Sequence, residues 1–361
     1  MPEIQYYNHE DLRDYVVRFF RTLQVPEIDA RIAADVLVSA DLRGISSHGV
    51  IRLHSYYGDR LKKGLVNPLS PIRTINDNPS TLTLDGCNGL GQVVAYRAMS
   101  RCIEKAEDTG LAITTVRNSN HFGIAGYYAM MALPHDMIGI SLTNSQPLVA
   151  PTYSIKAMIG TNPIAVAVPA GEEKPYVLDM ATSIVPLGKI QLYKKTGAAI
   201  PKGWGITSQG DLTHNPAEVI DGGALLPLGG PPELRGYKGY GLSLLVDILS
   251  GVLAGAAFGE TVGRPSKYRS SSDVGHFFAA IKIENFRPVD LFKADMDEYL
   301  QALKKAPKIP GQKRIYIHGE KEFEHSEKAI KEGVPLLAEV VALLKTAGES
   351  VKLPFDLKPV N

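Results

Sequence analysis

Short β-rich runs alternate with helical segments from residue 81 onward, and this alternation limits the possible folds more than any other feature of the sequence. TLTLDG and LAITTVRN lie on either side of a helical stretch, GQVVAYRAMSRCIEKAEDTG, and a second helix is expected over AGYYAMMALPHD. Three further β-rich runs then follow: MIGISLTN, PIAVAVPA and YVLDMAT. Alternating strands and helices predict a sheet domain of the α/β or α+β class.

Both ends of the chain have a helical pattern instead. HEDLRDYVVRFFRTL and VPEIDARIAADVLVSADLRG have the apolar spacing of amphipathic helices, and the tail predicts a strand over RIYIHGE and two helices that end near Gly348. We therefore expect a helical part formed by residues 1–75 and completed by 285–361, and a central sheet domain over 76–284. An irregular segment rich in Gly and Pro, residues 190–236, is predicted to be an ordered insertion in that domain.

Charge and cysteine content exclude several classes of protein. The 39 Lys and Arg residues balance 38 Asp and Glu residues, so neither nucleic acid nor an anionic membrane is an expected partner. Two cysteines without a CxxC pair, and histidines without HxxxH spacing, predict neither a disulfide framework nor a metal site. The first residues lack the apolar stretch of a secretory signal, which favours a cytoplasmic enzyme.

One apolar segment, GLSLLVDILSGVLAGAAFG at residues 241–259, has the length of a membrane span. Asp247 near its middle would cost about 2.5–3.5 kcal/mol at the centre of a bilayer, and four glycines interrupt its apolar surface. We therefore predict a helix that is buried in the protein core.

The segment SSHGVIRLHSYY, residues 46–57, repeats chemically useful side chains at helical spacing. On a helix over residues 48–61, one arc is apolar and faces the core: Val50, Leu53, Tyr57 and Leu61. The opposite arc carries His48, Arg52, Ser55 and Tyr56. Histidine can transfer a proton, arginine can bind a carboxylate through two hydrogen bonds, and tyrosine can donate from its hydroxyl. The pattern by itself fits a functional site and a solvated helix face equally well.

A second histidine, His121, lies in RNSNHFGIAG directly after the strand LAITTV. Enzymes with α/β folds place reacting groups in loops at the carboxyl ends of strands. The alternative is an ordinary Asx-type turn in which His121 has no function.

Two glycine-rich turns are candidates for binding a nucleotide. In DGCNGLGQVV, Gly89 and Gly91 imitate a dinucleotide fingerprint, but Val94 occupies the third glycine position and no acidic residue ends a second strand. A tight strand-to-helix turn is the better interpretation. In GYKGYG, Lys238 and a helix N-terminus could bind a phosphate, although a glycine-rich cap with a solvated lysine explains the pattern equally well.

Taken together, these stretches resemble one family, the malate/L-lactate dehydrogenase family of the second type, which is unrelated to the Rossmann malate and lactate dehydrogenases. That family also includes sulfolactate, ureidoglycolate and diketogulonate dehydrogenases and piperideine-2-carboxylate reductase. The matching stretches follow in order from about residue 35 to residue 320: ADLRGISSHGVIRL, DGCNGLGQVV, RNSNHFGIAGYY, IGISLTNSQPLVAP, GTNPIAVAVPA, LDMATS, GYKGYGLSLLVDILSG and IHGEKE.

The resemblance implies a cofactor, NAD or NADP, bound on a mainly antiparallel sheet with a non-Rossmann topology, and no metal. It also implies a homodimer. By this resemblance, cofactor contacts are expected at Ser145, Asp179, Met180, Ala181, Lys238, His318, Gly319 and Glu320. The family commonly has PGE where this sequence has HGE, so His318 departs from the family pattern.

The same resemblance makes His48 and His121 the candidates for proton transfer to a small 2-oxo or 2-hydroxy acid of the malate or L-lactate type. Arg52, Tyr56 and Ser47 are expected near the substrate. Alternative substrates are a cyclic imino acid such as piperideine-2-carboxylate, sulfolactate and ureidoglycolate. A serine hydrolase lacks support because no GxSxG elbow is present, and a nucleotide-binding protein without activity is a third possibility.

Overall fold

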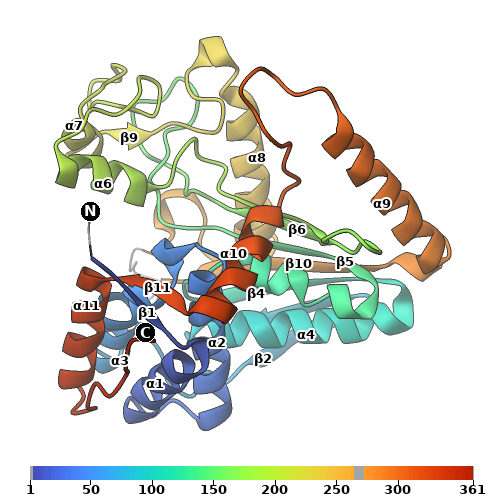
Figure 1. The fold of residues 1–361 in the computed structure, drawn as a ribbon, viewed down its shortest axis with the longest axis horizontal. Helices are drawn as coiled ribbons and strands as arrows, with labels where there is room; N and C mark the ends of the chain where they lie inside the picture. Colours follow the sequence, from blue (N-terminus) through green and yellow to red (C-terminus); the bar gives the residue numbers. More distant parts are fainter. Residues whose placement is uncertain (1–2, 264–271, 361) are drawn as a thin grey trace.

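The computed structural model describes residues 3–263 and 272–360, and a seven-stranded mixed sheet lies at its centre (Figure 1). The strands lie in the order β2-β3-β4-β10-β5-β6-β7. The β3–β4 pair is parallel and the other neighbouring pairs of this sheet are antiparallel. Their bounds are β2 Arg73–Asp77, β3 Thr81–Asp85, β4 Leu111–Ser119, β5 Met137–Thr143, β6 Ile164–Val168, β7 Tyr176–Met180 and β10 Val274–Lys282. The predicted α/β class with a mainly antiparallel mixed sheet is therefore confirmed.

Strand β10 occupies the middle of the sheet although it comes late in the sequence. It pairs with β4 on one side, where Phe278 lies opposite Thr114, and with β5 on the other, where Phe278 lies opposite Ser141. Segments more than 130 residues apart therefore meet at the centre of the sheet.

One face of the sheet is covered by α4 (Gly91–Thr109) and α5 (Ala125–Met130). Buried side chains from both helices and from the strands form a common hydrophobic cluster, which includes Leu84, Val94, Met99, Tyr128 and Phe278.

Helix α5 is shorter than the helix predicted over AGYYAMMALPHD. Pro134 lies in a 3₁₀ turn, Leu133–His135, because proline disfavours α-helical geometry in the residue before it.

The other face packs against α8 (Tyr237–Asp247) and the π-helical turn that continues it, Ile248–Val252. Val246 and Leu249 contact the sheet, but the opposite side of the helix is exposed. The exposed large apolar residues of the helix, the turn and the residue after it are Tyr237, Leu242, Leu244, Leu245, Ile248, Val252 and Leu253. The predicted buried core helix is therefore wrong, because a helix that is apolar all round has only one side against the sheet.

The two ends of the chain share one hydrophobic core. Strand β1 (Ile4–Tyr7) pairs antiparallel with β11 (Val334–Leu337), and Figure 1 shows α1, α2 and α11 grouped beside them. These helices span His9–Thr22, Glu27–Leu42 and Ala338–Glu349. Buried residues of both ends, among them Phe19, Leu37, Leu53 and Leu344, belong to the same cluster. The two N-terminal helices match their prediction to within a few residues.

The segment of residues 46–62 is not one α-helix. It consists of 3₁₀ turns at Ser46–His48 and Val50–Arg52, a π-helical turn at Leu53–Gly58, and one α-helical turn, α3, at Asp59–Lys62. Gly49 interrupts the helix with φ −87° and ψ −149°, and the buried Asp41 carboxylate accepts the Val50 N–H at 2.7 Å. The predicted apolar arc is nevertheless confirmed, since its four residues are all buried.

The glycine-rich segment forms a small lobe beside the sheet. It contains α6 (Leu187–Thr196), α7 (Pro216–Ile220) and the short strands β8 (Gly205–Ile206) and β9 (Ala224–Leu225). Ile190, Ile200 and Val219 pack together with Val149 and Ile159 from the loop after β5. The lobe therefore packs on the loop after β5 through a shared hydrophobic core.

The tail contains a long helix, α9 (Val289–Lys305), and then α10 (Glu320–Glu332). The predicted strand over RIYIHGE is wrong. One backbone bond joins this segment to β7, from the Val177 N–H to the His318 carbonyl, and Gly319 with φ +94° then turns the chain into α10. Among the described residues, no helix is long and apolar enough to cross a membrane.

Candidate active site

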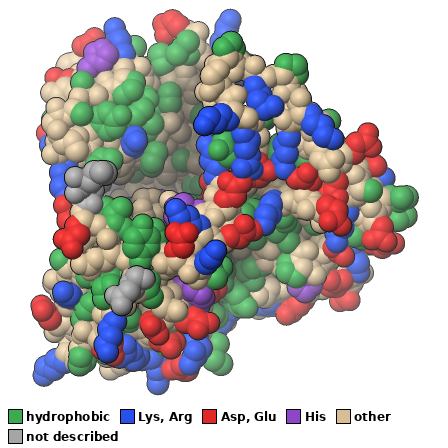
Figure 2. All heavy atoms as spheres, in the orientation of Figure 1, with side chains coloured by type: hydrophobic (Ala, Val, Ile, Leu, Met, Phe, Trp, Pro, Cys, Tyr) green, Lys and Arg blue, Asp and Glu red, His purple; other side chains and the backbone are tan. Residues whose placement is uncertain are grey.

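A cavity of about 480 Å³ lies between the 46–57 segment, the turn after β4, the turn after β5 and α6 of the lobe. Figure 2 shows the molecule hollowed between the lobe and the body of the structure. Six residues that the sequence singled out line this cavity: Ser47, His48, Arg52, Tyr56, His121 and Ser145.

His48 and His121 lie face to face in this cavity. Their rings are stacked with centroids 5.5 Å apart and planes 18° apart, and the Tyr56 ring meets His121 edge-on at 5.0 Å. The Nδ1 edge of the His121 ring faces the Tyr57 hydroxyl, whose oxygen lies 2.7 Å from Nδ1. Two histidines that are 73 positions apart in sequence are thus adjacent in the fold.

Glycines of the turn before α4 determine where His121 lies. A Cβ atom on Gly91 would lie 2.2 Å from the Asn120 carbonyl oxygen and 2.3 Å from that of His121, so only glycine allows this close approach. The Asn120 side chain donates to the Gly89 carbonyl at 2.9 Å. The predicted tight strand-to-helix turn at DGCNGLG is confirmed, and its role is to hold the turn that carries His121.

Burial and neighbouring positive charge keep both histidines neutral near pH 7. Burial, followed by the Arg52 charge, lowers the pKa of His48 to about 4. The pKa of His121 is lowered well below its usual value by burial first, and then by His48 and Arg52. A carboxylate bound to Arg52 would offset that positive charge and raise both pKa values.

Arg52 is held so that one side of its guanidinium is free for a ligand. Its Nε donates to the Ser47 carbonyl at 2.8 Å, and its Cζ lies 5.6 Å from the Tyr56 ring centroid. Ser47 Oγ is hydrogen-bonded to His48 Nδ1 at 2.9 Å. Within the described chain, Nη1 and Nη2 have no hydrogen-bond partner, and these are the two atoms that bind a carboxylate side by side.

Ser145 lies on the opposite wall of the cavity, in the turn after β5. Its Oγ accepts the Thr161 N–H at 3.0 Å, and its own N–H donates to Asn162 Oδ1 at 3.1 Å. Lys189 of α6 also lines the cavity and was missed in the sequence. The only signal for it was a lysine in GKIQ, and nothing local indicated that the lobe folds back over the site.

A second cavity, of about 240 Å³, lies beside the end of β7 and is lined by Arg43, Asp179, His318, Gly319 and Lys321 among others. Asp179 Oδ2 accepts the Gly126 N–H of α5 at 2.7 Å. Met180 and Ala181 follow Asp179 and line neither cavity. The Thr182 N–H then donates to the carbonyl of Thr161, a residue of the larger cavity. Residues 179–182 thus lead from one cavity to the other.

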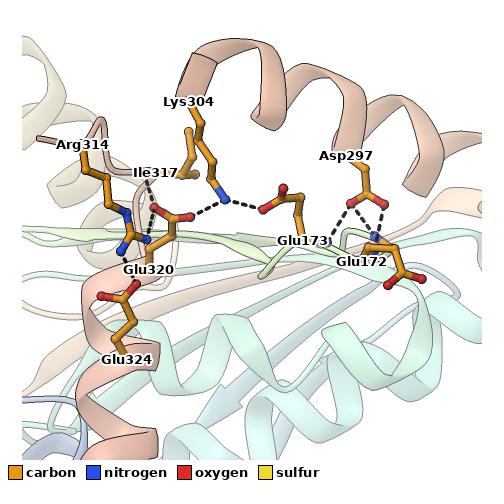
Figure 3. Close-up of polar contacts among 9 residues, drawn as sticks. Glu172, Glu173, Asp297, Lys304, Arg314, Ile317, Glu320 and Glu324 are labelled. Carbon is orange, nitrogen blue, oxygen red and sulfur yellow. Dashed lines mark hydrogen bonds and ion pairs between the residues drawn. The ribbon is translucent and has the colours of Figure 1, made fainter. Parts of the chain in front are cut away.

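Two further expected cofactor contacts also line neither cavity. Lys238 is exposed in the first turn of α8 and lines neither cavity. Glu320 is buried, and its carboxylate accepts hydrogen bonds from Lys304, Arg314 and the Ile317 N–H (Figure 3). Its contacts hold the turn of His318 and Gly319 rather than leave a free carboxylate. No group of His, Cys, Asp and Glu arranged to hold a metal ion occurs in residues 3–263 and 272–360.

Comparison with known proteins gives one consistent result. A family model described as malate/L-lactate dehydrogenase matches residues 7–345. Malate dehydrogenase of Pyrococcus abyssi is 51% identical over 333 residues, which cover 92% of this chain and 91% of that protein. L-sulfolactate dehydrogenase of Methanocaldococcus jannaschii is 39% identical over 319 residues, with coverage of 88% and 90%.

A solved structure supports the same assignment. The structure of malate dehydrogenase from Pyrococcus horikoshii matches this fold with a TM-score of 0.89 and 46% identity, covering 98% of each chain. The family predicted from the motifs is thereby confirmed: the chain belongs to the malate/L-lactate dehydrogenase family, whose members are oxidoreductases.

Proposed function

We propose that this protein is an NAD(P)-dependent dehydrogenase that interconverts a small 2-hydroxy acid and its 2-oxo acid, with the malate and oxaloacetate pair as the first candidate. The observation that carries this proposal is the free Nη edge of Arg52 beside the stacked rings of His48 and His121 in one cavity. The names of the relatives at 51% and 46% identity support malate as the substrate.

Arg52 binds the substrate carboxylate. Two parallel N–H···O bonds from Nη1 and Nη2 fix the plane of the carboxylate and therefore the position of the neighbouring C2 atom. Tyr56 and Ser47 lie beside this guanidinium, where their hydroxyls reach a bound acid.

When bound, a nicotinamide cofactor would supply the hydride chemistry at C2 of the substrate. The residues of the chain handle the proton. His121 and His48 face the reacting oxygen, and one donates or accepts the proton while the other orients the substrate. Burial is the main cause of the low pKa of both histidines, and the Arg52 charge adds to it. A bound carboxylate would offset that charge and so help the transferring histidine to hold a proton.

The two cavities fit a dinucleotide chemically. Asp179 offers a carboxylate for ribose hydroxyls, and Ser145 and Lys189 offer a hydroxyl and a cation for the nicotinamide half and the phosphates. Met180 and Ala181 lie along the connecting stretch, and His318 and Gly319 close the smaller cavity, supported by Glu320. We propose that the cofactor lies across this antiparallel side of the sheet, which is a non-Rossmann arrangement.

We further propose a homodimer and a division into two units. The exposed apolar side of α8 is the surface on which a second copy would pack, and Lys238 on the same helix would then approach a cofactor from that interface.

Residues 1–75 with 285–361 form the first proposed unit, supported by the core that both ends share, and residues 76–284 form the second.

Oxidation of NADH and of NADPH is measured with oxaloacetate, pyruvate, sulfopyruvate and a cyclic imino acid. Turnover of oxaloacetate above the others supports the proposal. Preference for sulfopyruvate would favour the activity named for the relative at 39% identity, and absence of turnover with every 2-oxo acid would refute the proposal.

The His48→Asn and His121→Asn variants then divide the roles. The variant that removes the transferring histidine loses about 10²–10⁴ in kcat, and the other mainly raises KM. Full activity of both variants would disprove this use of the histidines.

A further inference from the structure

Tyr57 belongs to the apolar arc of the 46–62 segment, yet its hydroxyl reaches the active site. The side chain is 4% exposed and packs in the core that the two chain ends share, with its ring edge-on to Phe20 at 6.5 Å. Its hydroxyl oxygen lies 2.7 Å from His121 Nδ1. A buried core residue thus makes the shortest polar contact of the candidate catalytic histidine.

The direction of this hydrogen bond follows from a third residue. The backbone N–H of Gly123 points at the same Nδ1 atom at 3.3 Å. A backbone N–H can only donate, so Nδ1 must accept, and a neutral His121 then carries its proton on Nε2. Tyr57 consequently donates as well, and the described residues offer its hydroxyl no other acceptor.

We propose that Tyr57 is a positioning residue that holds neutral His121 with its proton on Nε2 and so directs an N–H donor into the active-site cavity. No side chain or backbone group in the described part of the chain bonds Nε2, while the ring itself lines the cavity. The inference rests on the proposed function: the oxo oxygen of a 2-oxo acid anchored on Arg52 is the group that would accept this hydrogen bond. That bond draws electron density from the carbonyl carbon as hydride arrives, and the proton that the product alkoxide takes up then comes from His48, the other candidate histidine.

The surroundings make Tyr57 suitable for this role. Burial raises the pKa of its phenol well above the usual value, so the hydroxyl remains protonated and available as a donor. The charged and titratable groups that face His121 are His48, Arg52, Arg60 and His276, each of which lowers its pKa. A donor to Nδ1 acts in the same direction, because it stabilises the neutral ring.

The tautomer can be measured directly in the wild-type protein. Histidine labelled with ¹⁵N gives distinct shifts for a protonated and an unprotonated ring nitrogen, and the His121 signals are those that vanish in His121→Asn. At pH 7.5 we expect Nε2 to carry the proton and Nδ1 to have the shift of an acceptor. A proton on Nδ1 would overturn the proposal, and this measurement needs no catalytic activity.

The Tyr57→Phe variant is compared with Tyr15→Phe, since Tyr15 belongs to the same hydrophobic core and its hydroxyl also makes one buried hydrogen bond, to the Leu344 carbonyl at 2.9 Å. Tyr57→Phe should lower kcat for 2-oxo acid reduction about tenfold with KM nearly unchanged, and should raise the pKa of His121 in the ¹⁵N titration. Tyr15→Phe should change neither.

Three outcomes separate the two proposals. If the wild-type protein reduces no 2-oxo acid while Nε2 carries the proton, the positioning stands and the proposed function fails. If the protein is active but Tyr57→Phe behaves like Tyr15→Phe in kcat and in the His121 titration, the positioning role is refuted. Equal losses of kcat in both variants would likewise refute it, because they would reflect damage to the shared core.

Discussion

Lys304, in the last turn of α9, lies with its Nζ 2.5 Å from Oε1 of Glu320, the first residue of α10 (Figure 3). Lys304 also bonds Glu173 in the turn between β6 and β7, and Asp297 on the same helix accepts the N–H groups of Gly171, Glu172 and Glu173. An otherwise exposed helix therefore connects the β6–β7 turn to the residues that close the smaller cavity.

From this contact we expect Lys304→Met to loosen the turn of His318 and Gly319. KM for the cofactor should rise roughly three- to tenfold while kcat changes little, because the proposed reacting groups in the larger cavity are untouched. Lys305→Met is the control, since Lys305 is the exposed neighbour on the same helix. Equal cofactor KM values for the two variants would contradict this role of Lys304.

Arg52→Lys should lower kcat/KM for the 2-oxo acid roughly 10- to 100-fold, because lysine cannot form the paired N–H···O contact. The loss should be much smaller for Arg18→Lys, whose guanidinium pairs with Asp356 on the surface. Steady-state kinetics over a range of substrate concentrations measures both. A normal KM for the 2-oxo acid in Arg52→Lys would show that Arg52 does not bind the substrate carboxylate.

Gly49→Ala should destabilise the protein by about 1–3 kcal/mol, because the new Cβ atom would lie 2.1 Å from Asp41 Oδ2 inside the core. Gly188→Ala is the matched control: Gly188 lies in helix α6 and a Cβ there meets no atom within 4 Å. Urea unfolding compares the two variants. A Gly49→Ala protein as stable as Gly188→Ala would show that Asp41 can move aside.

Asp41 should also make stability depend on pH. Burial raises the pKa of its carboxyl to about 7, far above its value in the unfolded chain. Its contribution to stability is therefore fully present below the unfolded pKa and is lost as the pH rises through 7. Asp41→Asn retains an acceptor for the Val50 N–H and cannot ionise. The difference in free energy of unfolding, variant minus wild type, should therefore increase by roughly 1–3 kcal/mol from pH 5 to pH 8. A constant difference across this range would contradict the raised pKa.

Leu245→Glu should dissociate the proposed homodimer. It places a charge on the exposed apolar side of α8 in both subunits, and these two sides would face each other in the interface. Light scattering after size-exclusion chromatography should give the mass of one chain at concentrations where the wild type gives two. Ile28→Glu, at an exposed apolar residue of α2, is the control and should leave the mass unchanged. A monomeric wild type would refute the homodimer.

Local spacing predicted which side chains share one side of the 46–62 segment, and the family resemblance identified that side as a site. His48, Arg52 and Tyr56 occupy one side of the 46–62 segment because the apolar residues of the opposite arc are buried, and that division follows from local periodicity. For the turn after β4, the pattern left a site and an ordinary turn open, and the resemblance favoured a site; the structure brings His121 to the same cavity.

Other features depend on contacts that no local pattern encodes. Lys189 reaches the cavity because the lobe folds over the cavity. One side of α8 is exposed because the sheet covers only the other side of this helix. Tyr57 was assigned to the core, correctly, but the polar end of a buried tyrosine needs a partner that only the tertiary structure supplies. The prediction of a strand over RIYIHGE was wrong because the Glu320 carboxylate accepts the Ile317 N–H and holds this stretch in a turn.

The position of β10 determines when the candidate active site can form during synthesis. This strand separates β4, which leads to His121, from β5, which leads to Ser145, so the two walls of the cavity have no fixed spacing until residue 282 has been made. The closing β1–β11 pair requires almost the whole chain. Pairings of such long sequence separation form slowly, and a nascent chain that already contains every proposed catalytic residue would still have no assembled site.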